Sequence, residues 1–391
     1  MKRALTALLI CDLAIFVDVV GSGIVIPAIP QFAQIFGASE GAMGYAFSAF
    51  AVGFLLTALP LGVLVDRTGR SGLVVGAGMV SIVLAGVLFA TATSLWTFAA
   101  AQALHGVGSA AAWVSGQPLA ARIAQNMPRR GVWFGSITIA MGLGLIAGPL
   151  IGSIGELRLP FVIYIVMAAI AALLAFWLLR HERAPGTARG LEYLAVLRNP
   201  RVLAACLAVM VLYAGVGMSE VLFPLFMDAR GYPKSGIGVL FFALALAMSL
   251  TQPLVTHWLD RVGHSRPSVA AFVVVAATLS AMVLGDTYAT WVPVFVFLGV
   301  ATGILVSGSM MIIAAGSRAG EHGLGYAAWN FSFSIGYLVG PALGGALVEL
   351  TRGWGAVGGL RAPFFVLSLL TLVSVPLFRM LMGRGRVAAA P

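Results

Sequence analysis

Long apolar runs constrain this chain more than any other feature of its sequence. A helix rises about 1.5 Å per residue and the hydrocarbon of a bilayer is ~30 Å thick, so roughly 20 apolar residues are needed to cross it. The composition, 60% apolar and only 9% charged, excludes a soluble globular protein. The sequence therefore predicts an all-α integral membrane protein with twelve transmembrane helices. The runs lie near residues 4–29, 42–64, 72–92, 95–120, 131–154, 160–179, 202–226, 236–258, 267–285, 289–316, 323–350 and 362–382.

The positive charges are divided unevenly between the two sides of the predicted membrane. The net charge of +10 would suggest a nucleic-acid partner in a soluble protein. With both termini in the cytoplasm, however, most of the 23 Lys and Arg residues fall on the cytoplasmic side, as the positive-inside rule requires. We therefore expect a multi-pass protein of the inner (plasma) membrane with no nucleic-acid partner. The residues on the opposite side are Arg158, Arg230, Lys234, Arg352 and Arg361.

The same six-helix pattern occurs twice. The cluster Asp66-Arg67-Thr68-Gly69 recurs as Asp260-Arg261-Val262-Gly263, and GLIAGPLIGS (144–153) recurs as GYLVGPALGG (336–345). Two parallel six-helix halves joined by a cytoplasmic connection are an arrangement of secondary transporters, which bind their substrate between the halves. We predict an N-terminal bundle over residues 1–180, a charged cytoplasmic linker over 181–201 and a C-terminal bundle over 202–391.

The stretch G-x-x-x-D-R-x-G-R at residues 62–70 resembles the loop signature of the major facilitator superfamily. In that family the aspartate meets the N-terminal end of a helix from the other half and helps to close the cytoplasmic face. A carboxylate so placed gains roughly 0.3–1 kcal/mol. The alternative is that both clusters only anchor the topology, for which basic residues suffice. The resemblance implies a conformational latch formed by Gly62, Asp66, Arg67, Gly69 and Arg70, with a degraded second copy at Asp260 and Arg261, where Thr256 and His264 replace the outer residues.

A second stretch, beginning at Gly135 and ending at Ser153, resembles the antiporter motif of the same superfamily. Glycines at helical spacing let two backbones approach closely, and a proline bends the helix. The resemblance implies export against proton entry, whereas the alternative is tight packing with no bearing on transport direction. The residues with the implied packing role are Gly144, Gly148, Pro149 and Gly152, together with Gly340 and Pro341 in the second half.

Few ionisable groups interrupt the apolar runs. Apart from Arg379 near the end of the last run, no Lys or Arg lies inside them, and the carboxylates clearly inside are Asp12, Asp18 and Glu220. A charged group at a helix centre costs roughly 2.5–3.5 kcal/mol on insertion scales, so these positions are candidate functional sites. Negative charge without positive charge favours a cationic or neutral substrate, or protons, over an anion.

Two of these carboxylates lie in stretches that resemble helices of the vesicular monoamine transporters and their bacterial drug:proton antiporter relatives. VDVVGSGIVIPAIP (17–30) resembles the first helix, in which an aspartate contributes to the amine site, and SEVLFPLF (219–226) resembles the seventh. Removal from water favours the neutral form of a carboxyl group, so Asp18 and Glu220 would suit the exchange of protons for an organic cation. Each could instead be a structural carboxyl group, hydrogen-bonded within its bundle.

Other positions depart from those relatives. Gln102 takes the place of the arginine in their R-x-x-Q-G-x-G pattern, and His105 takes the place of the glutamine. A histidine can change its protonation near neutral pH, so His105 either replaces part of a proton relay or is a neutral hydrogen-bonding group. Ser307 and Asn330 stand where the amine transporters have aspartates, which leaves the proton stoichiometry and a monoamine substrate open. Trp113 lies on the stripe of Gln102 and His105. Asn330 and Tyr337 share a face that we expect to contact the substrate.

The sequence thus predicts a monomeric major-facilitator transporter that exports a small amphipathic, cationic compound in exchange for protons. The alternatives are a dedicated exporter or importer of one metabolite such as a siderophore, an integral-membrane enzyme and a non-transporting sensor. No nucleophile elbow, phosphate loop or metal-ligand cluster supports an enzyme. The two cysteines, Cys11 and Cys206, form no recognisable motif, so we expect neither a metal nor a cofactor.

Overall fold

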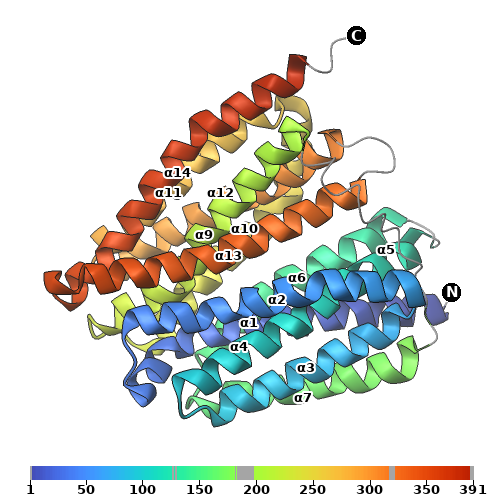
Figure 1. The fold of residues 1–391 in the computed structure, drawn as a ribbon, viewed down its shortest axis with the longest axis horizontal. Coiled ribbons are helices and arrows are strands. Elements are labelled where there is room, and N and C mark those ends of the chain that lie inside the picture. Colours follow the sequence, from blue (N-terminus) through green and yellow to red (C-terminus); the bar gives the residue numbers. More distant parts are fainter. Residues whose placement is uncertain are drawn as a thin grey trace. The chain divides into compact units, whose positions relative to one another are not determined.

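All regular secondary structure in the described part of the chain is helical (Figure 1). The computed structural model describes residues 2–125, 127, 130–180, 182, 198–316 and 322–387. Most of the predicted linker, residues 183–197, therefore lies outside the described residues. The elements are α1 (Lys2–Phe36), α2 (Glu40–Thr68), α3 (Ser71–Thr91), α4 (Leu95–Ala111), the π-helical turn η1 (Ala112–Gly116), α5 (Gln117–Gln125), α6 (Arg130–Gly152), α7 (Arg158–Leu174), the π-helical turn η2 (Ala175–Leu179), α9 (Pro200–Asp228), α10 (Lys234–Val262), α11 (Ser265–Leu284), α12 (Tyr288–Gly316), α13 (His322–Leu350), the 3₁₀ turn η3 (Arg352–Trp354) and α14 (Ala356–Val387).

Eleven helices in the described residues are long and apolar enough to cross a bilayer. The run expected at 95–120 corresponds to α4, η1 and α5, which follow one another without a break from Leu95 to Gln125. The predicted all-helical architecture is confirmed. The total of twelve spans and the cytoplasmic position of both termini stay predictions.

Apolar side chains cover the outer surfaces of the helices as well as their buried faces. On α7 and η2 an exposed stripe repeats every three or four residues, and Leu173 and Trp177 in it are 70% and 72% exposed. Such a surface is unfavourable in water but suits contact with lipid. The stripe consists of Val162, Val166, Ile170, Leu173 and Trp177.

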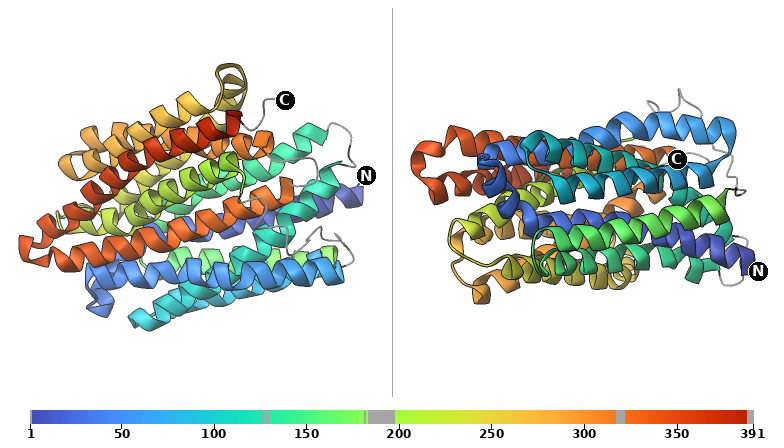
Figure 2. Two further views of the ribbon diagram at one scale, coloured as in Figure 1. Left: turned by 45° about the horizontal axis from the view of Figure 1, so that its top comes forward. Right: turned by 90° about the horizontal axis from the view of Figure 1, so that it is seen from below.

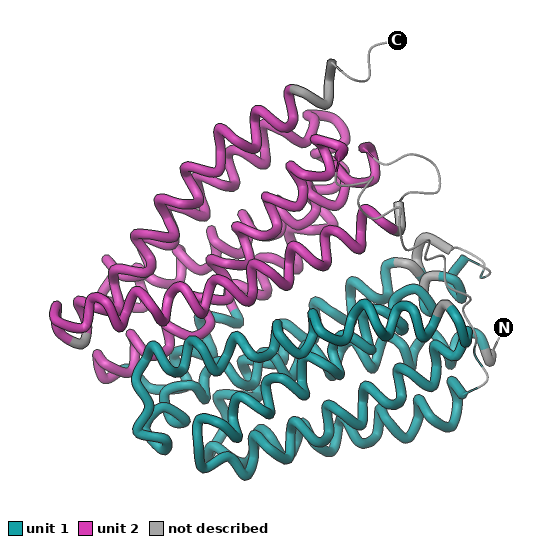
Figure 3. The backbone as a smooth tube through the Cα atoms, viewed as in Figure 1, with its two compact units in different colours: residues 1–188, 232–242 teal, residues 189–231, 243–391 magenta. Residues whose placement is uncertain are grey.

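The contacts divide the chain into two compact units (Figure 3). Unit 1 consists of residues 1–188 together with 232–242, and unit 2 consists of residues 189–231 and 243–391. The first residues of α10 thus belong to unit 1 and the rest of that helix to unit 2. Within each unit the helices lie side by side with roughly aligned axes (Figures 1 and 2).

One helix is central to each unit. In unit 1, α1 is the most buried of the long apolar helices and packs against α5, α6 and α7. In unit 2, α9 contacts α11, α12, α13 and α14. Clusters of fully buried aromatic rings fill the space beside each central helix. They include Phe32, Phe89, Phe98 and Phe161 in unit 1, and Phe223, Trp291, Phe295 and Phe364 in unit 2.

Glycine ridges bring each central helix against a partner. A methyl group built on Gly148 of α6 would lie 2.7 Å from the Cα atom of Gly23 in α1. In unit 2, a methyl group on Gly340 of α13 would lie 2.1 Å from the carbonyl oxygen of Ala214 in α9. Both distances are shorter than real Cβ contacts, so no larger residue fits without moving the backbone. The ridges consist of Gly144, Gly148 and Gly152 on α6, and of Gly336, Gly340 and Gly344 on α13.

We predict that Gly148→Ala lowers the thermal stability of the protein, because the added methyl group meets backbone that cannot move aside. Overpacking of this kind typically costs ~1–3 kcal/mol. Gly135→Ala on the same helix is the matched control, since nothing lies within 4 Å of the position where its Cβ would be. Thermal unfolding in detergent, followed by size-exclusion chromatography, measures both variants. Equal stability of the two would show that α1 and α6 can separate without cost.

Candidate functional site

Asp18 is the buried end of a polar cluster in unit 1. Its side chain, on α1, is held by groups from α4 and η1, and the residue is 2% exposed. Its Oδ2 atom accepts hydrogen bonds from the hydroxyl of Ser109 at 3.0 Å and from the indole N–H of Trp113 at 2.9 Å. His105 places Nε2 3.2 Å from the backbone carbonyl oxygen of Asp18 and 3.3 Å from Oδ1. Because a carbonyl oxygen only accepts, Nε2 is a donor in this arrangement.

The backbone of the fourth helical segment has a special form at this cluster. Ala112–Gly116 is a π-helical turn, in which the helix is locally wider, and Trp113 lies within it. Turns of this kind are rare and frequently occur at functional sites. The turn places the Trp113 indole at the Asp18 carboxylate, and its position could not be read from the apolar pattern of residues 95–120.

Aromatic rings enclose His105 and keep water away from the carboxylate. The imidazole is 1% exposed, and the rings of Phe50, Tyr164 and Phe89 have their centroids 5.2, 6.0 and 6.5 Å from its own. Tyr164 was not among the predicted site residues. A methyl group on Gly21 would lie 2.1 Å from its hydroxyl oxygen, so only glycine at this point of α1 admits the ring. No signal in the sequence identifies that pairing.

Gln102 and Asp12, both buried, stay outside this cluster. The Nε2 atom of Gln102 makes no hydrogen bond to any described residue, and neither does the Oδ1 atom of Asp12. The structure therefore brings Asp18, His105 and Trp113 together, whereas Gln102 does not hydrogen-bond to the carboxylate.

Glu220 is the centre of the polar contacts in unit 2. It lies on α9, is partly exposed, and accepts a hydrogen bond from the hydroxyl group of Tyr337 on α13. Asn330 instead donates its amide to the carbonyl oxygen of Tyr326, one turn earlier on α13, at 3.0 Å. Two of the predicted residues, Glu220 and Tyr337, are thus hydrogen-bonded to each other, whereas the Asn330 amide is hydrogen-bonded within its own helix.

A row of aromatic rings extends from Tyr337. We call Tyr213, Trp329, Phe333 and Tyr337 the aromatic row. Phe333 stacks on Tyr337 with centroids 5.7 Å apart and on Trp329 with centroids 6.1 Å apart, and Tyr213 meets it edge-on at 4.4 Å. The Trp329 indole N–H donates to Ser309 of α12 at 2.8 Å. Phe333 was not predicted, although its spacing of four residues from Trp329 and from Tyr337 is the signal that could have found it.

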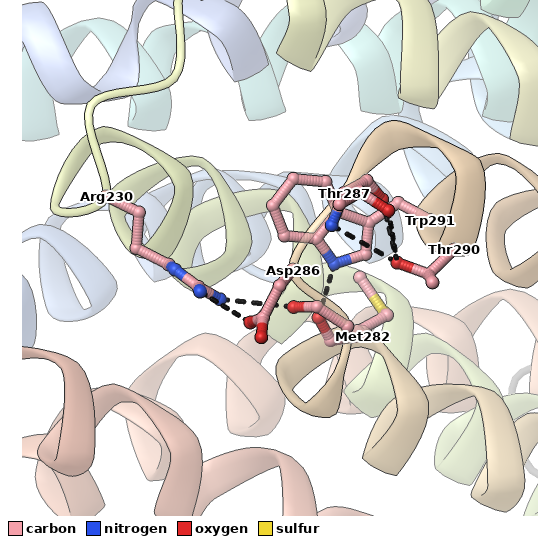
Figure 4. A network of polar contacts seen from close by, with 7 residues as sticks. Arg230, Met282, Asp286, Thr287, Thr290 and Trp291 are labelled. Atoms are coloured by element: carbon pink, nitrogen blue, oxygen red, sulfur yellow. Dashed lines mark hydrogen bonds and ion pairs between the residues drawn. The ribbon is translucent and has the colours of Figure 1, made fainter.

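The end of α9 is fixed by a separate network (Figure 4). Arg230 pairs with Asp286 in the connection between α11 and α12, and its guanidinium lies over the ring of Phe226, 5.3 Å from the centroid. Beside this pair the indole of Trp291 donates to the carbonyl oxygen of Met282 at 2.9 Å. The helix that carries Glu220 is therefore held at its C-terminal end by α11 and α12.

The glycine of each D-R-x-G cluster ends a helix. Gly69 and Gly263 have φ angles of 67° and 83°, and their N–H groups bond to the carbonyl oxygens of Val65 and Leu259 at 2.7 and 2.9 Å. Glycine adopts this left-handed conformation without strain, which explains its place in the motif. The side chain of Asp66 lies outside the described part of the chain, so the latch stays a prediction. The exposed charged residues of the clusters are Arg67, Arg70, Asp260 and Arg261.

The chemistry available in the described residues is that of single carboxylates beside neutral donors and aromatic rings. No three His, Cys, Asp or Glu side chains among these residues converge in a way that could hold a metal ion. The carboxylates with such neighbours are Asp18 in unit 1 and Glu220 in unit 2.

The model of the Major Facilitator Superfamily matches residues 11–235 and 205–390, which together span nearly the whole chain. The chain belongs to the major facilitator superfamily. This agrees with the repeated glycine ridges and with the two D-R-x-G turns.

Relatives in the family carry names that describe drug resistance or amine transport. Multidrug resistance protein 2 of Bacillus subtilis (strain 168) is 26% identical over 356 residues, which cover 86% of this chain and 87% of that protein. The chromaffin granule amine transporter of Homo sapiens is 26% identical over 284 residues, 70% of this chain. The match covers 54% of that transporter, about half its length.

Solved structures share the fold at low sequence identity. A bacterial homolog of the human lysosomal transporter Spinster, in an inward-facing and unoccupied conformation, superposes with a TM-score of 0.80 at 14% identity and covers 97% of each chain. The nucleoside transporter NupG gives 0.79 at 15% identity, covering 98% of this chain and 99% of its own. The protein is thus a multi-pass membrane transporter of small molecules, and not an enzyme.

We predict that Tyr337→Phe lowers the melting temperature, because it removes a donor to the Glu220 carboxylate. A hydrogen bond to a charged group contributes about 1.5–3 kcal/mol. Tyr326→Phe is the matched control on the same helix, since the Tyr326 side chain is exposed. Thermal unfolding of both variants in one detergent measures the difference. Unchanged unfolding of Tyr337→Phe would mean that this contact contributes nothing to stability.

Proposed function

We propose that the protein is a secondary active transporter that exports small amphipathic organic cations in exchange for protons by alternating access. The observation that carries the proposal is Glu220 beside the aromatic row in unit 2. Glu220 offers a countercharge, and Tyr337, which belongs to the row, donates to it. Ring faces attract cations with roughly 0.5–2 kcal/mol each, more when water is excluded. Together they form a site for a positively charged compound with apolar parts.

The aromatic row also supports a broad range of cargo. Its rings already pack on one another, so the row is in place before any compound binds. Preorganisation of this kind reduces the entropy that binding costs. Ring faces impose no fixed hydrogen-bond pattern, so compounds that share only charge and apolar surface would be accepted.

Similarity to named proteins supports the same substrate class. The multidrug resistance proteins 1 and 2 of Bacillus subtilis are 25% and 26% identical to this chain and match 86% of it. Amine transporters match 70% of it. Amines are cations at neutral pH, and drug-resistance transporters act on foreign compounds, so a hydrophobic cation is the cargo on which both names agree.

Proton coupling and export complete the proposal. Asp18 in unit 1 and Glu220 in unit 2 are both largely removed from bulk water, and they give the protein groups that can exchange a proton for a cation. The glycine ridge of α6 has the pattern associated with antiport. We place the protein in the plasma membrane as a monomer with both termini cytoplasmic, and we assign bundles 1–180 and 202–391 to the two moving halves.

The D-R-x-G clusters take the role of cytoplasmic latches in this proposal. Gly69 and Gly263 set the turns after α2 and α10, and the charged side chains around them are exposed and thus available for pairing. Closing and opening of these contacts would accompany the change of access.

We predict that inside-out vesicles with an acidic lumen lose part of their pH gradient when tetraphenylphosphonium, a hydrophobic cation, is added. A pH-sensitive dye reports the change. Glu220→Gln should reduce the response about tenfold or more, because a neutral amide no longer supplies the countercharge. Neutral and anionic compounds should give no response in the same vesicles.

Glu349→Gln is the control for this experiment, because Glu349 is a carboxylate of α13 that pairs with Arg352 at the end of that helix. It should respond like the wild type. Equal responses of Glu220→Gln and wild type would contradict the proposed site. A response to a single metabolite and to no other cation would favour a dedicated exporter, and accumulation in the opposite direction would favour an importer.

A further inference from the structure

We propose that Ser309 of α12 is a positioning residue for the cation site formed by Glu220 and the aromatic row. Its hydroxyl group holds the indole of Trp329, and through that ring it keeps the ring of Phe333 in place. This inference rests on the proposed transport of organic cations, and it adds α12 to the helices that determine how tightly the compound binds. Ser309 is 1% exposed, so it acts through Trp329 and not by touching the compound.

The hydroxyl group of Ser309 makes two hydrogen bonds, one as donor and one as acceptor. It donates its proton to the carbonyl oxygen of Val306, one turn earlier on α12, at 2.9 Å. It accepts from the indole N–H group of Trp329, on α13, at 2.8 Å. An indole nitrogen only donates and a carbonyl oxygen only accepts, so both bonds form only when the hydroxyl proton points to Val306. The direction of the hydroxyl group is therefore fixed, and it fixes the indole in turn.

Trp329 depends on this acceptor because it is buried. The residue is 6% exposed, and Ser309 is the acceptor for its N–H group. A buried N–H group without an acceptor is unfavourable, since it has lost its hydrogen bond to water. Removal of the Ser309 hydroxyl group would therefore release the indole from its present orientation.

The ring of Trp329 supports the middle of the aromatic row. The centroid of Phe333 lies 6.1 Å from that of Trp329, with the planes 6° apart, and 5.7 Å from that of Tyr337, with the planes 23° apart. Tyr213 of α9 meets Trp329 and Phe333 edge-on, with centroids 6.4 and 4.4 Å away. Phe333 has no polar atom in its side chain, so contacts with these rings decide its position. A change in the orientation of Trp329 is thus passed on to Phe333.

Hydrogen bonds anchor the row at both of its ends. Tyr337 donates to Glu220, and Trp329 donates to Ser309. At the Glu220 end, a methyl group built on Gly217 of α9 would lie 3.2 Å from the Tyr337 ring, so this ring also lies close against α9. Ser309 and Glu220 thus fix opposite ends of the same row, but of these two only Glu220 supplies a charge for the compound.

The buried rings of the row support the more accessible ones. Trp329 and Tyr337 are 6% and 7% exposed, whereas Phe333 and Tyr213 are half-buried. The half-buried rings offer the surface that a compound can reach. The position of that surface is therefore set by a tryptophan that the compound does not need to touch.

The packing of α12 gives Ser309 a fixed position relative to α9. The helix packs against α9 and α11. At its C-terminal end, the carbonyl oxygen of Gly316 accepts a hydrogen bond from the side-chain amide of Asn199 at 2.6 Å. Asn199 directly precedes α9 and also accepts from the backbone N–H group of Arg201 at 3.0 Å. Because α9 carries Glu220, α12 helps to set the distance between the negative charge and the row.

Binding of tetraphenylphosphonium to the purified protein in nanodiscs tests the role of Ser309. Ser309→Ala should weaken binding about three- to tenfold, because the rings must then be ordered when the compound binds. In transport the same change should raise KM and leave kcat unchanged, since the contacts with the compound are the same once the rings are in place. Equal binding by Ser309→Ala and the wild type would overturn the proposal.

Ser374→Ala on α14 is the matched control. Ser374 is buried in the same unit, at 8% exposed, and donates to the carbonyl oxygen of Thr371, three residues earlier, at 2.6 Å. The control therefore loses a buried hydroxyl group and a bond within its helix, as Ser309→Ala does, but no bond to a tryptophan. It should bind the probe as the wild type does. A loss as large as that of Ser309→Ala would show a general effect of removing a buried hydroxyl group and would overturn the proposal.

A second variant separates positioning from loss of packing. Trp329→Phe removes the indole N–H group and keeps an aromatic ring. In that background Ser309→Ala should cause no further loss of binding, because the group that Ser309 holds is already absent. If Ser309→Ala weakens binding equally in both backgrounds, Ser309 does not act through Trp329 and the inference is wrong.

The two proposals fail in different ways. If the wild type binds no organic cation, the proposed substrate class is wrong and the role of Ser309 falls with it. If the wild type binds the cation and Glu220→Gln does not, while Ser309→Ala binds it as tightly as the wild type, the cation site stands and only the positioning role of Ser309 is overturned.

Discussion

Close contact between helix backbones is the constraint on which both units depend. In a bilayer the lipid tails are as apolar as the helix side chains, so burying those side chains between helices gives little free energy. Helix association therefore relies on close packing. The glycine ridges of α6 and α13 supply that packing on α1 and α9, where added methyl groups would lie 2.1–2.8 Å from the nearest atoms. Because α1 carries Asp18 and α9 carries Glu220, these ridges also fix the two carboxylates within their units.

The internal repeat preserves packing more faithfully than chemistry. Gly148 and Gly340 have equivalent roles, and so do Gly69 and Gly263 at the ends of α2 and α10. The two carboxylates, by contrast, do not have equivalent surroundings. Asp18 is closed in by a histidine, a serine and a tryptophan, whereas Glu220 lies beside stacked aromatic rings. The two copies thus share a scaffold and offer different environments for negative charge.

Much of the fold could be predicted because its main signals are local in sequence. The apolar runs, the glycines that end helices and the repeated motifs each need only a few neighbouring residues to be recognised. The contact between Glu220 of α9 and Tyr337 of α13 joins residues far apart in the sequence. Helical spacing had already placed each of them on a face expected to contact the substrate. The enclosure of His105 by Phe50 and Tyr164 depends on how α2, α4 and α7 pack, and no local pattern records it. Gln102 was predicted to share the stripe of His105, yet its Nε2 atom makes no hydrogen bond to a described residue, because one face of a helix meets several neighbours.

The π-helical turn at Ala112–Gly116 has a consequence for the whole fourth segment. Such a turn is equivalent to one residue inserted into an α-helix, and one residue corresponds to about 100° of rotation. The phase of the helix therefore differs on its two sides. A helical wheel that fits Gln102 and His105 therefore does not predict the faces of α5, which are rotated about the helix axis relative to those of α4. An uninterrupted helix would fix the direction of α5 by that of α4. With the turn between them, the side of α4 that faces Asp18 and the sides of α5 can be specified independently by the sequence.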